Sequence, residues 1–312
     1  MNKTGKAVVI GGGTMGSAVA AIFCAAGWNA DVVETDASVR AALPGKITAA
    51  GSVIGNGNIG GTVTIHEELD AIDWRGVDIV IECVFEILAV KKAVFARLEA
   101  LCPASIPLTS NSSSFPISDI GQGLSTLDRM LGLHFFMPAH LVPAVEVVRS
   151  AASDEAVTER VCQIMCEVGK KPIRVQRDVP GFLANRIQHA LMREAIALVE
   201  EGFASAEDVD AAVRYGFGLR YIAAGPLLQK DLGGIDIHYA AAKTMYPHLH
   251  NDQEPSAYMR RLVEEGHIGV KSPARKGFYD WTEDRIAAEQ LRYETALLKA
   301  INILLDEEAR KE

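Results

Sequence analysis

The sequence predicts an α/β fold in which a mostly parallel sheet domain is followed by an all-α C-terminal domain. Short apolar runs of strand length alternate with helical patterns up to residue 179, as expected when both faces of a sheet are covered. A glycine-rich turn follows the first run directly, and after Pro180-Gly181 the composition shifts to helices. We therefore expect two domains, residues 1–179 and 180–312, in agreement with the length of the chain.

The composition describes an ordinary globular protein. Hydrophobic residues make up 49% and charged residues 23% of the chain, and the formal net charge is −9. This acidic balance argues against a nucleic-acid partner, and the absence of a long apolar run argues against a membrane partner. The N-terminus shows no signal-peptide pattern. The five cysteines form no CxxC pair and no histidine cluster joins them, so we predict reduced thiols, no metal site and a cytoplasmic location.

A glycine turn connects the first expected strand, at Lys6–Ile10, to a helix. Gly11, Gly13 and Gly16 have the G-x-G-x-x-G spacing of a dinucleotide-binding turn, which predicts a Rossmann-like domain. Gly11 permits the tight turn, Gly13 lets the backbone approach a pyrophosphate, and Gly16 lets the helix pack close to the strand. The alternative is a glycine-rich turn without a ligand. The helix residues whose N–H groups would face the phosphates are Thr14, Met15 and Gly16.

A carboxylate at the end of the second strand indicates which cofactor binds. That strand is expected at Asp31–Thr35, and Glu34 follows the glycine turn by about 20 residues. A carboxylate there accepts hydrogen bonds from the adenosine ribose and repels a 2′-phosphate, so NAD is favoured over NADP. Asp36 is the second candidate for this role, and either residue could instead be a solvated loop acid.

The same reading assigns the remaining elements. Residues 51–61, GSVIGNGNIGG, are glycine-rich and nearly uncharged, and we expect a loop there. We expect Ser153 to cap the helix at 154–168. Further strands are expected at 62–65, 78–84, 106–109, 131–136, 144–148 and 171–176, and a further helix at 90–101. In the second domain, helices are expected at 182–201, 206–215 and 227–245 (the last interrupted by Gly233-Gly234) and at the end of the chain, after a turn or strand at 277–281.

Two ionisable residues lie within otherwise apolar strands. His134 belongs to the run at 131–136 and Glu146 to the run at 144–148, with a proline-containing loop between them. Strands paired around that loop bring the imidazole and the carboxylate within hydrogen-bond reach. The carboxylate then fixes the tautomer and stabilises the imidazolium, which leaves the other ring nitrogen as a proton acceptor. The alternative is a core histidine and a rim glutamate without a chemical role.

A polar turn, SNSSS at 110–114, follows the strand at 106–109. Hydroxyl groups at the carboxyl end of a strand lie where open α/β sheets bind ligands. The turn is therefore a candidate ligand site. The alternative is a serine-rich loop that caps the helix expected near Pro116.

These motifs, in this order, resemble the 3-hydroxyacyl-CoA dehydrogenase family over nearly the whole chain. The resemblance is carried by the glycine turn, IECVFEILAVKK, SNSSSFPISDI, LGLHFFMP with VEVV, PGFLANR and the GFYDW ending. It implies an NAD-dependent dehydrogenase that acts on a CH–OH group, with the active site between a Rossmann-like domain and a helical domain. It also implies a homodimer.

The resemblance further implies roles for single residues. His134 would be the catalytic base and Glu146 its partner, while Ser113 and Asn185 would hydrogen-bond the substrate oxygen. The residues that match those holding the nicotinamide ribose are Glu86 and Lys91.

Two departures from the family pattern concern the catalytic loop and the CoA site. Met137 stands where the family usually has Asn, and a thioether cannot donate a hydrogen bond. The acyl-CoA enzymes carry a long, lysine-rich helical insertion that helps to bind CoA. Here the corresponding segment, residues 44–61, is shorter, and Lys46 is its only basic residue. Loss of that cationic surface weakens the case for a thioester substrate.

A third departure concerns the substrate. Pro143 and the stretch YGFGLRY at 215–221, followed by Gly225-Pro226, resemble the lambda-crystallin/L-gulonate 3-dehydrogenase branch, which oxidises free hydroxy acids. Arg220 is then a candidate for pairing with a substrate carboxylate, within the chain or across a dimer contact, because a guanidinium binds a carboxylate through two parallel hydrogen bonds. The alternative is a surface arginine beside a helix end.

We therefore predict an NAD-dependent oxidoreductase that oxidises the hydroxyl of a small L-3-hydroxy acid to a keto group, with His134 as the base. One alternative is an L-3-hydroxyacyl-CoA dehydrogenase that acts on a CoA thioester. The other is an NAD-binding, crystallin-like protein without useful turnover, which only Met137 favours.

Overall fold

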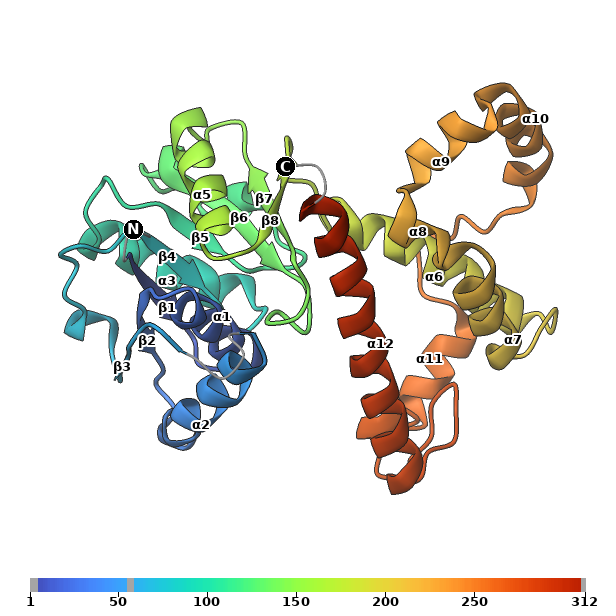
Figure 1. Ribbon diagram of the computed structural model, residues 1–312, viewed down its shortest axis with the longest axis horizontal. Coiled ribbons are helices and arrows are strands. Elements are labelled where there is room, and N and C mark those ends of the chain that lie inside the picture. The colour runs from blue at the N-terminus through green and yellow to red at the C-terminus, as the bar shows by residue number, and fades with distance from the viewer. Residues whose placement is uncertain (1–4, 55–58, 310–312) are drawn as a thin grey trace. The chain divides into compact units, whose positions relative to one another are not determined.

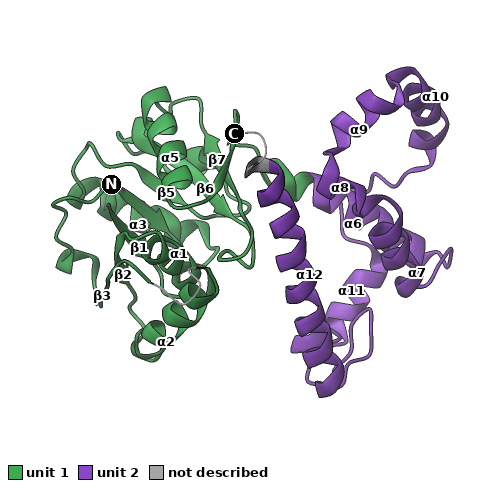
Figure 2. Cartoon of the chain, in the orientation of Figure 1, with its two compact units in different colours: residues 1–186 green, residues 187–312 purple. Residues whose placement is uncertain are grey.

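The computed structural model describes residues 5–54 and 59–309. The chain forms two compact units, residues 1–186 and 187–312 (Figure 2). The units divide within helix α6 (Ala184–Glu200), whereas the domain boundary proposed from the sequence lies a few residues earlier, after residue 179.

The first unit contains an eight-stranded sheet with the strand order β3-β2-β1-β4-β5-β6-β7-β8 (Figure 1). All neighbouring strands are parallel except β6 and β7, which are antiparallel. This confirms the predicted mostly parallel, Rossmann-like sheet. The strands are β1 (Lys6–Ile10), β2 (Asn29–Val33), β3 (Val63–His66), β4 (Ile79–Glu82), β5 (Leu108–Ser110), β6 (Met130–Phe135), β7 (Ala144–Arg149) and β8 (Lys171–Val175).

Helices flank the sheet and make up the second unit, as predicted (Figure 1). The predicted helix at 206–215 is divided: the α-helix α7 ends at Ala211, and a π-helix continues over Ala212–Gly218. The interruption predicted at Gly233-Gly234 is confirmed, since it separates α9 from α10. The other helices are α1 (Thr14–Ala25), α2 (Ala37–Ile54), α3 (Leu88–Leu101), α4 (Ile117–Ile120), α5 (Glu155–Glu167), α7 (Ala206–Ala211), α8 (Arg220–Ala223), α9 (Pro226–Gly233), α10 (Ile235–Met245), α11 (Ala257–Glu264) and α12 (Glu283–Ala309), with short 3₁₀ turns at Leu69–Ala71, Leu127–Arg129, Tyr246–His248 and Gly269–Lys271.

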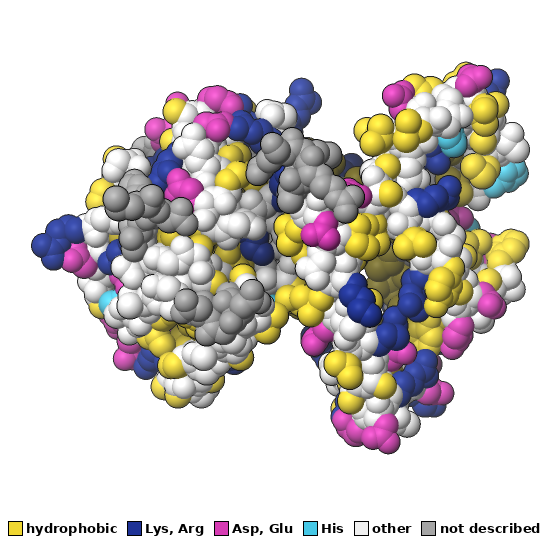
Figure 3. Space-filling view, viewed as in Figure 1, with side chains coloured by type: hydrophobic (Ala, Val, Ile, Leu, Met, Phe, Trp, Pro, Cys, Tyr) yellow, Lys and Arg dark blue, Asp and Glu magenta, His cyan; other side chains and the backbone are white. Residues whose placement is uncertain are grey.

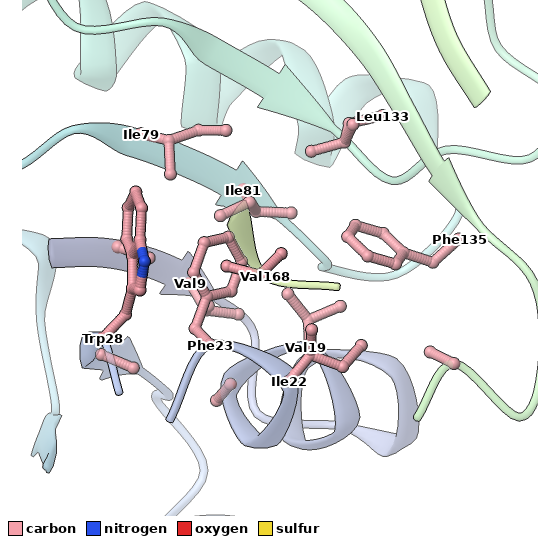
Figure 4. Packing of buried hydrophobic residues seen from close by; sticks show 14 of the residues in the cluster. Val9, Val19, Ile22, Phe23, Trp28, Ile79, Ile81, Leu133, Phe135 and Val168 are labelled. Atoms are coloured by element: carbon pink, nitrogen blue, oxygen red, sulfur yellow. The ribbon is translucent and has the colours of Figure 1, made fainter. Parts of the chain in front are cut away.

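The core of the first unit lies on both faces of the sheet. On one face, Val9, Ile81 and Leu133 from three strands belong to one buried cluster with Phe23 of α1 (Figure 4). On the opposite face of the sheet, a second buried cluster contains strand residues together with residues of α3, among them Phe95. Because both faces are covered, the central strands are mostly apolar, and they hold their carboxyl ends in fixed positions for a site.

Helix α2 corrects part of the loop expected at 51–61. Leu43, Ile47 and Gly51 are spaced four residues apart and are buried, and α2 packs against α1. A side chain at Gly51 would come within 2.8 Å of Ile59, so the stripe is closely packed. Burial of this stripe outweighs the helix-breaking tendency of Pro44, whose missing N–H removes one helical hydrogen bond. The loop prediction was therefore wrong for residues 51–54, and residues 55–58 lie outside the described residues.

The cap predicted for α5 is also corrected. Asp154, not Ser153, is the N-cap, because its Oδ1 accepts hydrogen bonds from the backbone N–H groups of Ala156 (2.7 Å) and Val157 (3.1 Å). The Ser153 hydroxyl is buried and donates to the carbonyl oxygen of Met130 at 2.8 Å. Ser153 and Asp154 are adjacent in the sequence, and the exposed residue of the two, Asp154, is the N-cap.

In the helical unit, His250 joins the segment that follows α10 to helix α6. Its Nδ1 lies 3.1 Å from Oε2 of Glu194, and its Nε2 lies 2.9 Å from Oε1 of Glu201. Only the imidazolium form has a donor on each ring nitrogen and satisfies both carboxylates. The hydrogen bonds to Glu201 and Glu194 accordingly raise the pKa of His250 above its ordinary value.

We expect the helical unit to lose stability as the pH rises through the raised pKa of His250. The contribution of this group is fully present below the ordinary imidazole pKa of about 6.5 and disappears once the folded form deprotonates. His250→Gln should flatten this part of the curve of melting temperature against pH, measured by circular dichroism. His189→Gln, at an exposed histidine of helix α6, is the control and should leave the curve unchanged. Parallel curves for the wild type and His250→Gln would show that the two contacts contribute nothing.

Candidate active site

The glycine turn has the geometry expected of a dinucleotide-binding turn. Gly11 has φ +97°, and a side chain there would lie 2.7 Å from the carbonyl oxygen of Cys83. A side chain at Gly16 would lie 1.8 Å from the carbonyl oxygen of Gly11, so the close approach of helix to strand requires glycine. Around Gly13, by contrast, nothing lies within 4 Å of the side-chain position, and a ligand can approach the backbone there.

The N-terminus of α1 completes this cradle. Gly13 is the N-cap, and no side chain caps the helix. The first-turn N–H groups, at Thr14, Met15 and Gly16, have no partner within an α-helix. Exposed N–H groups at a helix N-terminus suit a pyrophosphate, so these residues fit an NAD cofactor. When bound, NAD supplies the acceptor for a hydride.

The structure separates the two candidates for the ribose carboxylate. Glu34 lies beside the glycine turn: its Oε2 accepts from the N–H of Gly12 at 2.7 Å and its Oε1 from the N–H of Asp36 at 2.9 Å. The Asp36 carboxylate instead caps α2, accepting from Ser38 and Val39. Hydrogen bonds from the Ser38 side chain, and then from these two amides, lower the pKa of Asp36. The geometry therefore favours Glu34 for the adenosine ribose.

We expect Glu34→Ala to weaken NAD binding by about 10- to 100-fold, the effect of losing a hydrogen bond to a charged group. Titration of the protein with NAD, followed by calorimetry, measures this. Asp36→Ala is the matched control: it should lower the melting temperature through the lost helix cap while NAD affinity stays within about twofold. The reverse pattern, with unchanged affinity in Glu34→Ala and weak binding in Asp36→Ala, would assign the ribose to Asp36.

His134 and Glu146 face each other across the antiparallel pair β6 and β7, as predicted. Nδ1 of His134 lies 2.8 Å from Oε2 of Glu146, and both side chains are buried. The imidazole also packs against the rings of Phe136 and Phe182, at centroid distances of 4.8 and 5.8 Å. The hydrogen bond through Nδ1 leaves Nε2 as the nitrogen that can accept a proton.

The second oxygen of Glu146 is held by the start of α6. Oε1 accepts from the N–H groups of Leu183 at 3.1 Å and Ala184 at 2.8 Å. Burial alone would raise the pKa of Glu146, but the hydrogen bonds from His134 and from these two amides lower it below the ordinary carboxyl value. The carboxylate is therefore fixed as an anion at both ends, and it does not compete for the proton that His134 accepts.

The turn before α6 explains how these amides reach Glu146. Gly181 and Phe182 both have positive φ, +75° and +50°, and they reverse the chain just before the helix. Positive φ is rare for a bulky residue such as phenylalanine. The strained conformation persists because the Phe182 ring is buried against His134 and the following amides are bonded to Glu146.

The polar turn at 110–114 carries Ser113 and is attached to the strand that carries His134. Oδ1 of Asn111 accepts from the N–H of Phe135 at 2.9 Å. Nδ2 of Asn185 lies 3.4 Å from the carbonyl oxygen of Ser113. The structure thus brings Ser113 and Asn185 together, at the carboxyl ends of the parallel strands, and ties their turn to the histidine strand.

Glu86 lies in the connection between β4 and α3, and Lys91 lies in α3. Lys91 is buried, and its ammonium lies 2.9 Å from Oε1 of Glu82 and 3.2 Å from Oε2 of Glu86. Glu82 is fully buried and also accepts from the Ser110 hydroxyl at 2.6 Å. Sequence reasoning missed Glu82, although a carboxylate inside the apolar run DIVIECV was a signal that a cation had to lie beside it.

Two residues of interest remain, Met137 and Arg220. Met137 follows the histidine strand and is 65% exposed. Arg220, at the start of α8 in the helical unit, is also exposed, and no hydrogen bond or ion pair of its side chain occurs within the described residues. Among residues 5–54 and 59–309, no cluster of His, Cys, Asp and Glu is arranged to hold a metal ion, and no helix is long and apolar enough to cross a membrane.

Comparison with known proteins shows the family to which the chain belongs. Residues 6–179 match the NAD-binding domain of 3-hydroxyacyl-CoA dehydrogenase, and residues 181–281 match its C-terminal domain. The 3-hydroxyadipyl-CoA dehydrogenase of Escherichia coli is 35% identical over 89% of this chain, which spans only 59% of that enzyme. The lambda-crystallin of Oryctolagus cuniculus is 30% identical over 72% of this chain and 73% of its own length.

A third relative is similar over almost its whole length. The 5-formyl-3-hydroxy-2-methylpyridine 4-carboxylate 5-dehydrogenase of Mesorhizobium japonicum is 29% identical, over 95% of this chain and 97% of that enzyme. A solved structure of an enzyme with this activity superposes with a TM-score of 0.89, covering 97% of this chain and 99% of the other at 27% identity. These matches confirm the resemblance found in the sequence. The chain therefore belongs to the 3-hydroxyacyl-CoA dehydrogenase family, whose members are NAD-dependent dehydrogenases that act on a CH–OH group.

Proposed function

We propose that this chain oxidises the hydroxyl of a small L-3-hydroxy acid to a keto group, with NAD as the oxidant and His134 as the base. The observation that carries the proposal is the buried pair of His134 and Glu146, with a 2.8 Å contact that leaves Nε2 free to accept a proton. Oxidation of an alcohol removes a proton from oxygen and a hydride from carbon, so a base and a hydride acceptor are both needed.

His134 takes the hydroxyl proton on Nε2 as the C–O bond gains double-bond character. Glu146 stabilises the imidazolium that forms, since its carboxylate is held as an anion beside Nδ1. Ser113 and Asn185 orient the reacting oxygen. Hydrogen bonds to that oxygen strengthen as negative charge develops on it, which is where binding lowers the barrier.

Two observations favour a free acid over a CoA thioester. Residues 44–54 form the second part of helix α2, and Lys46 is the only basic residue of segment 44–61. The segment therefore offers little positive charge to the phosphates of CoA. The relative with the TM-score of 0.89 is named for a small free carboxylate. Arg220, exposed and carrying a guanidinium, is our candidate for pairing with such a carboxylate.

The same relative supports a second candidate activity. Its substrate carries a formyl group, and an aldehyde in water forms a hydrate that presents a C–H and an O–H on one carbon, as an alcohol does. The proton then goes to His134 and the hydride to NAD, and the product is a carboxylic acid. Oxidation of a small carboxylate-bearing aldehyde is therefore the reaction to test beside that of hydroxy acids.

We also propose that the enzyme is a homodimer that associates through its helical unit. Large apolar side chains are exposed along that unit, where Figure 3 shows them in yellow. Exposed apolar area of this extent marks an association surface. The most exposed of these residues include Leu227, Leu232, Tyr215, Tyr246 and Leu291. The five cysteines are free thiols, which supports a cytoplasmic location.

The test is NADH formation with three matched sets of compounds: free 3-hydroxy acids, their CoA esters, and small carboxylate-bearing aldehydes. We expect turnover of a free acid or aldehyde, with KM raised about 10-fold or more in Arg220→Gln because a charge-assisted pair is lost. Arg214→Gln, an exposed arginine of the same unit, is the control and should leave KM unchanged. Turnover of thioesters alone would favour the alternative of an acyl-CoA dehydrogenase. If no compound is turned over, only the NAD-binding, crystallin-like alternative remains.

A further inference from the structure

The loop at residues 136–143 connects β6, which carries His134, to β7, which carries Glu146. It begins with Phe136, whose ring packs against the imidazole of His134 at a centroid distance of 4.8 Å. Strand β6 runs parallel to β5, so it ends at the edge of the sheet where the carboxyl ends of the parallel strands lie. The loop therefore borders the place where an open α/β sheet binds its ligands.

A lysine from the turn between α5 and β8 contacts this loop. Nζ of Lys170 donates to the carbonyl oxygen of Ala139 at 2.7 Å and to that of Val142 at 2.8 Å. Within the loop, the N–H groups of Leu141 and Val142 both donate to the carbonyl oxygen of Pro138 at 3.0 Å. The ammonium thus closes, through two of its three donors, a turn that the loop has begun with its own backbone.

The charge of Lys170 is buried without an acid beside it. The residue is 8% exposed, and within the part of the chain that the structure describes its side chain bonds only to the two loop carbonyls. Burial lowers the pKa of Lys170 to about 8, so at neutral pH the amine keeps its proton. Burial of a charge is costly, and here no neighbouring carboxylate is neutralised in return. The contacts of this lysine therefore serve the loop.

The backbone of Lys170 is fixed by the end of α5. Gly169 has φ +76°, and the N–H of Lys170 donates to the carbonyl oxygen of Met165 at 2.8 Å. This is the hydrogen bond of a Schellman motif, in which glycine follows the last turn of a helix. The next residue, Lys171, donates its N–H to the carbonyl oxygen of Pro143 at 2.8 Å. A helix of the core thus supports the loop at its middle and at its end.

We propose that Lys170 is a positioning residue for the loop at 136–143 and, through it, for the Phe136 ring that packs against His134. Its ammonium fixes two carbonyl groups of the loop, so the start of the loop keeps one conformation beside the base. The inference rests on the proposed function, in which His134 removes the substrate proton. Loss of the ammonium should reduce turnover while NAD binding persists, because the glycine turn belongs to other strands of the sheet.

The first test needs no substrate. Hydrogen exchange, followed by mass spectrometry on the peptide that spans the loop, compares the wild type with Lys170→Met, whose side chain has a similar length and no donor. We expect exchange in the loop, at the amides of Leu141 and Val142, to accelerate about tenfold or more. Calorimetric titration of the same samples should give an NAD affinity within about twofold of the wild type.

Arg129→Met is the matched control, because Arg129 is a second buried cation that holds a loop through carbonyl oxygens. Its guanidinium donates to the carbonyl oxygens of Ile106 at 3.1 Å and Cys102 at 3.2 Å, in the connection between α3 and β5. This substitution should accelerate exchange in that connection and lower the melting temperature, as Lys170→Met does. Exchange in the loop at 136–143 should stay unchanged.

The second test follows the His134 ring itself. Proton NMR of isotope-labelled histidine reports the imidazole, whose signal is assigned by its loss in His134→Gln. The aromatic ring of Phe136 shifts that signal, since the two rings are in contact. We expect the signal to move in Lys170→Met and to stay in place in Arg129→Met. An unmoved signal together with unchanged exchange in the loop would overturn the proposal.

The third test is steady-state kinetics with L-3-hydroxybutyrate as the free-acid probe, at a temperature at which all variants are folded. We expect kcat/KM for the acid to fall about tenfold or more in Lys170→Met, while KM for NAD stays within about twofold. Equal losses in Lys170→Met and Arg129→Met would show that the lysine only stabilises the fold, against the proposal. If the wild type does not turn over the acid, the proposed function fails for this compound, while the exchange and NMR measurements still decide whether Lys170 positions the loop.

Discussion

His134→Ala should reduce the rate of NADH formation by about 100- to 10,000-fold, the contribution expected from a positioned general base. The reason is the geometry of the pair: Nδ1 is bonded to Glu146, and Nε2 is the nitrogen that remains to accept the hydroxyl proton. NAD affinity should stay within about twofold, because the cofactor cradle at the glycine turn belongs to other strands of the sheet.

The removal of a buried ring also creates a cavity between Phe136 and Phe182, and that effect must be separated from the loss of the base. His134→Gln serves this purpose. Its amide can still donate to Glu146 and fills most of the space, but it cannot take a proton at neutral pH. We expect His134→Gln to lose as much activity as His134→Ala while melting closer to the wild type.

The measurements are steady-state kinetics with the best substrate of the proposed screen, calorimetric NAD titration and melting curves. His66→Gln, the same substitution on strand β3, is the control and should keep full turnover. If activity and NAD affinity fall together in His134→Ala, the residue is structural. If activity persists in His134→Gln, another group removes the proton.

Much of the sheet unit could be predicted from the sequence because its physical requirements leave a direct pattern. Strands covered on both faces, such as Lys6–Ile10, appear in the sequence as mainly apolar runs. The glycine turn could also be predicted, because at Gly11 and Gly16 any side chain would collide with the backbone. The contact between His134 and Glu146 followed from two short strands joined by one loop, which become neighbours in the sheet.

What could not be predicted depends on contacts between segments that are distant in the sequence. Helix α2 contains Pro44 and Gly51, which locally argue for a loop, and its buried stripe has a purpose only when α1 is present to pack against it. The amides that hold the second oxygen of Glu146 are directed by the positive φ of Phe182, a conformation that the residue type disfavours. The contacts of Lys170 were hidden for the same reason, since the carbonyl oxygens that it binds lie 31 and 28 residues earlier in the chain.

The buried network around Lys91 leads to the prediction with the largest effect on stability. Lys91→Met should destabilise the sheet unit by ~3–5 kcal/mol, the cost of leaving a buried charge without its partner. The carboxylates of Glu82 and Glu86 both face the Lys91 ammonium, and Glu82 is fully buried. For a unit of this size, the loss corresponds to a decrease in melting temperature on the order of 10 °C. Thermal unfolding followed by circular dichroism measures it.

Two further variants separate charge from packing. Lys92→Met makes the same substitution at the next residue, whose ammonium donates to Gln122 near the surface, and should cost less than about 0.5 kcal/mol. Glu82→Gln combined with Lys91→Met replaces the buried carboxylate by a neutral amide, whose oxygen can still accept from the N–H of Val84 and whose NH2 group can donate to the hydroxyl of Ser110. It should recover more than half of the loss. The comparison is decisive, because a packing defect caused by methionine would persist in the double variant, whereas an uncompensated charge would not. Recovery would show that Lys91 balances the buried charge of Glu82 in this interior.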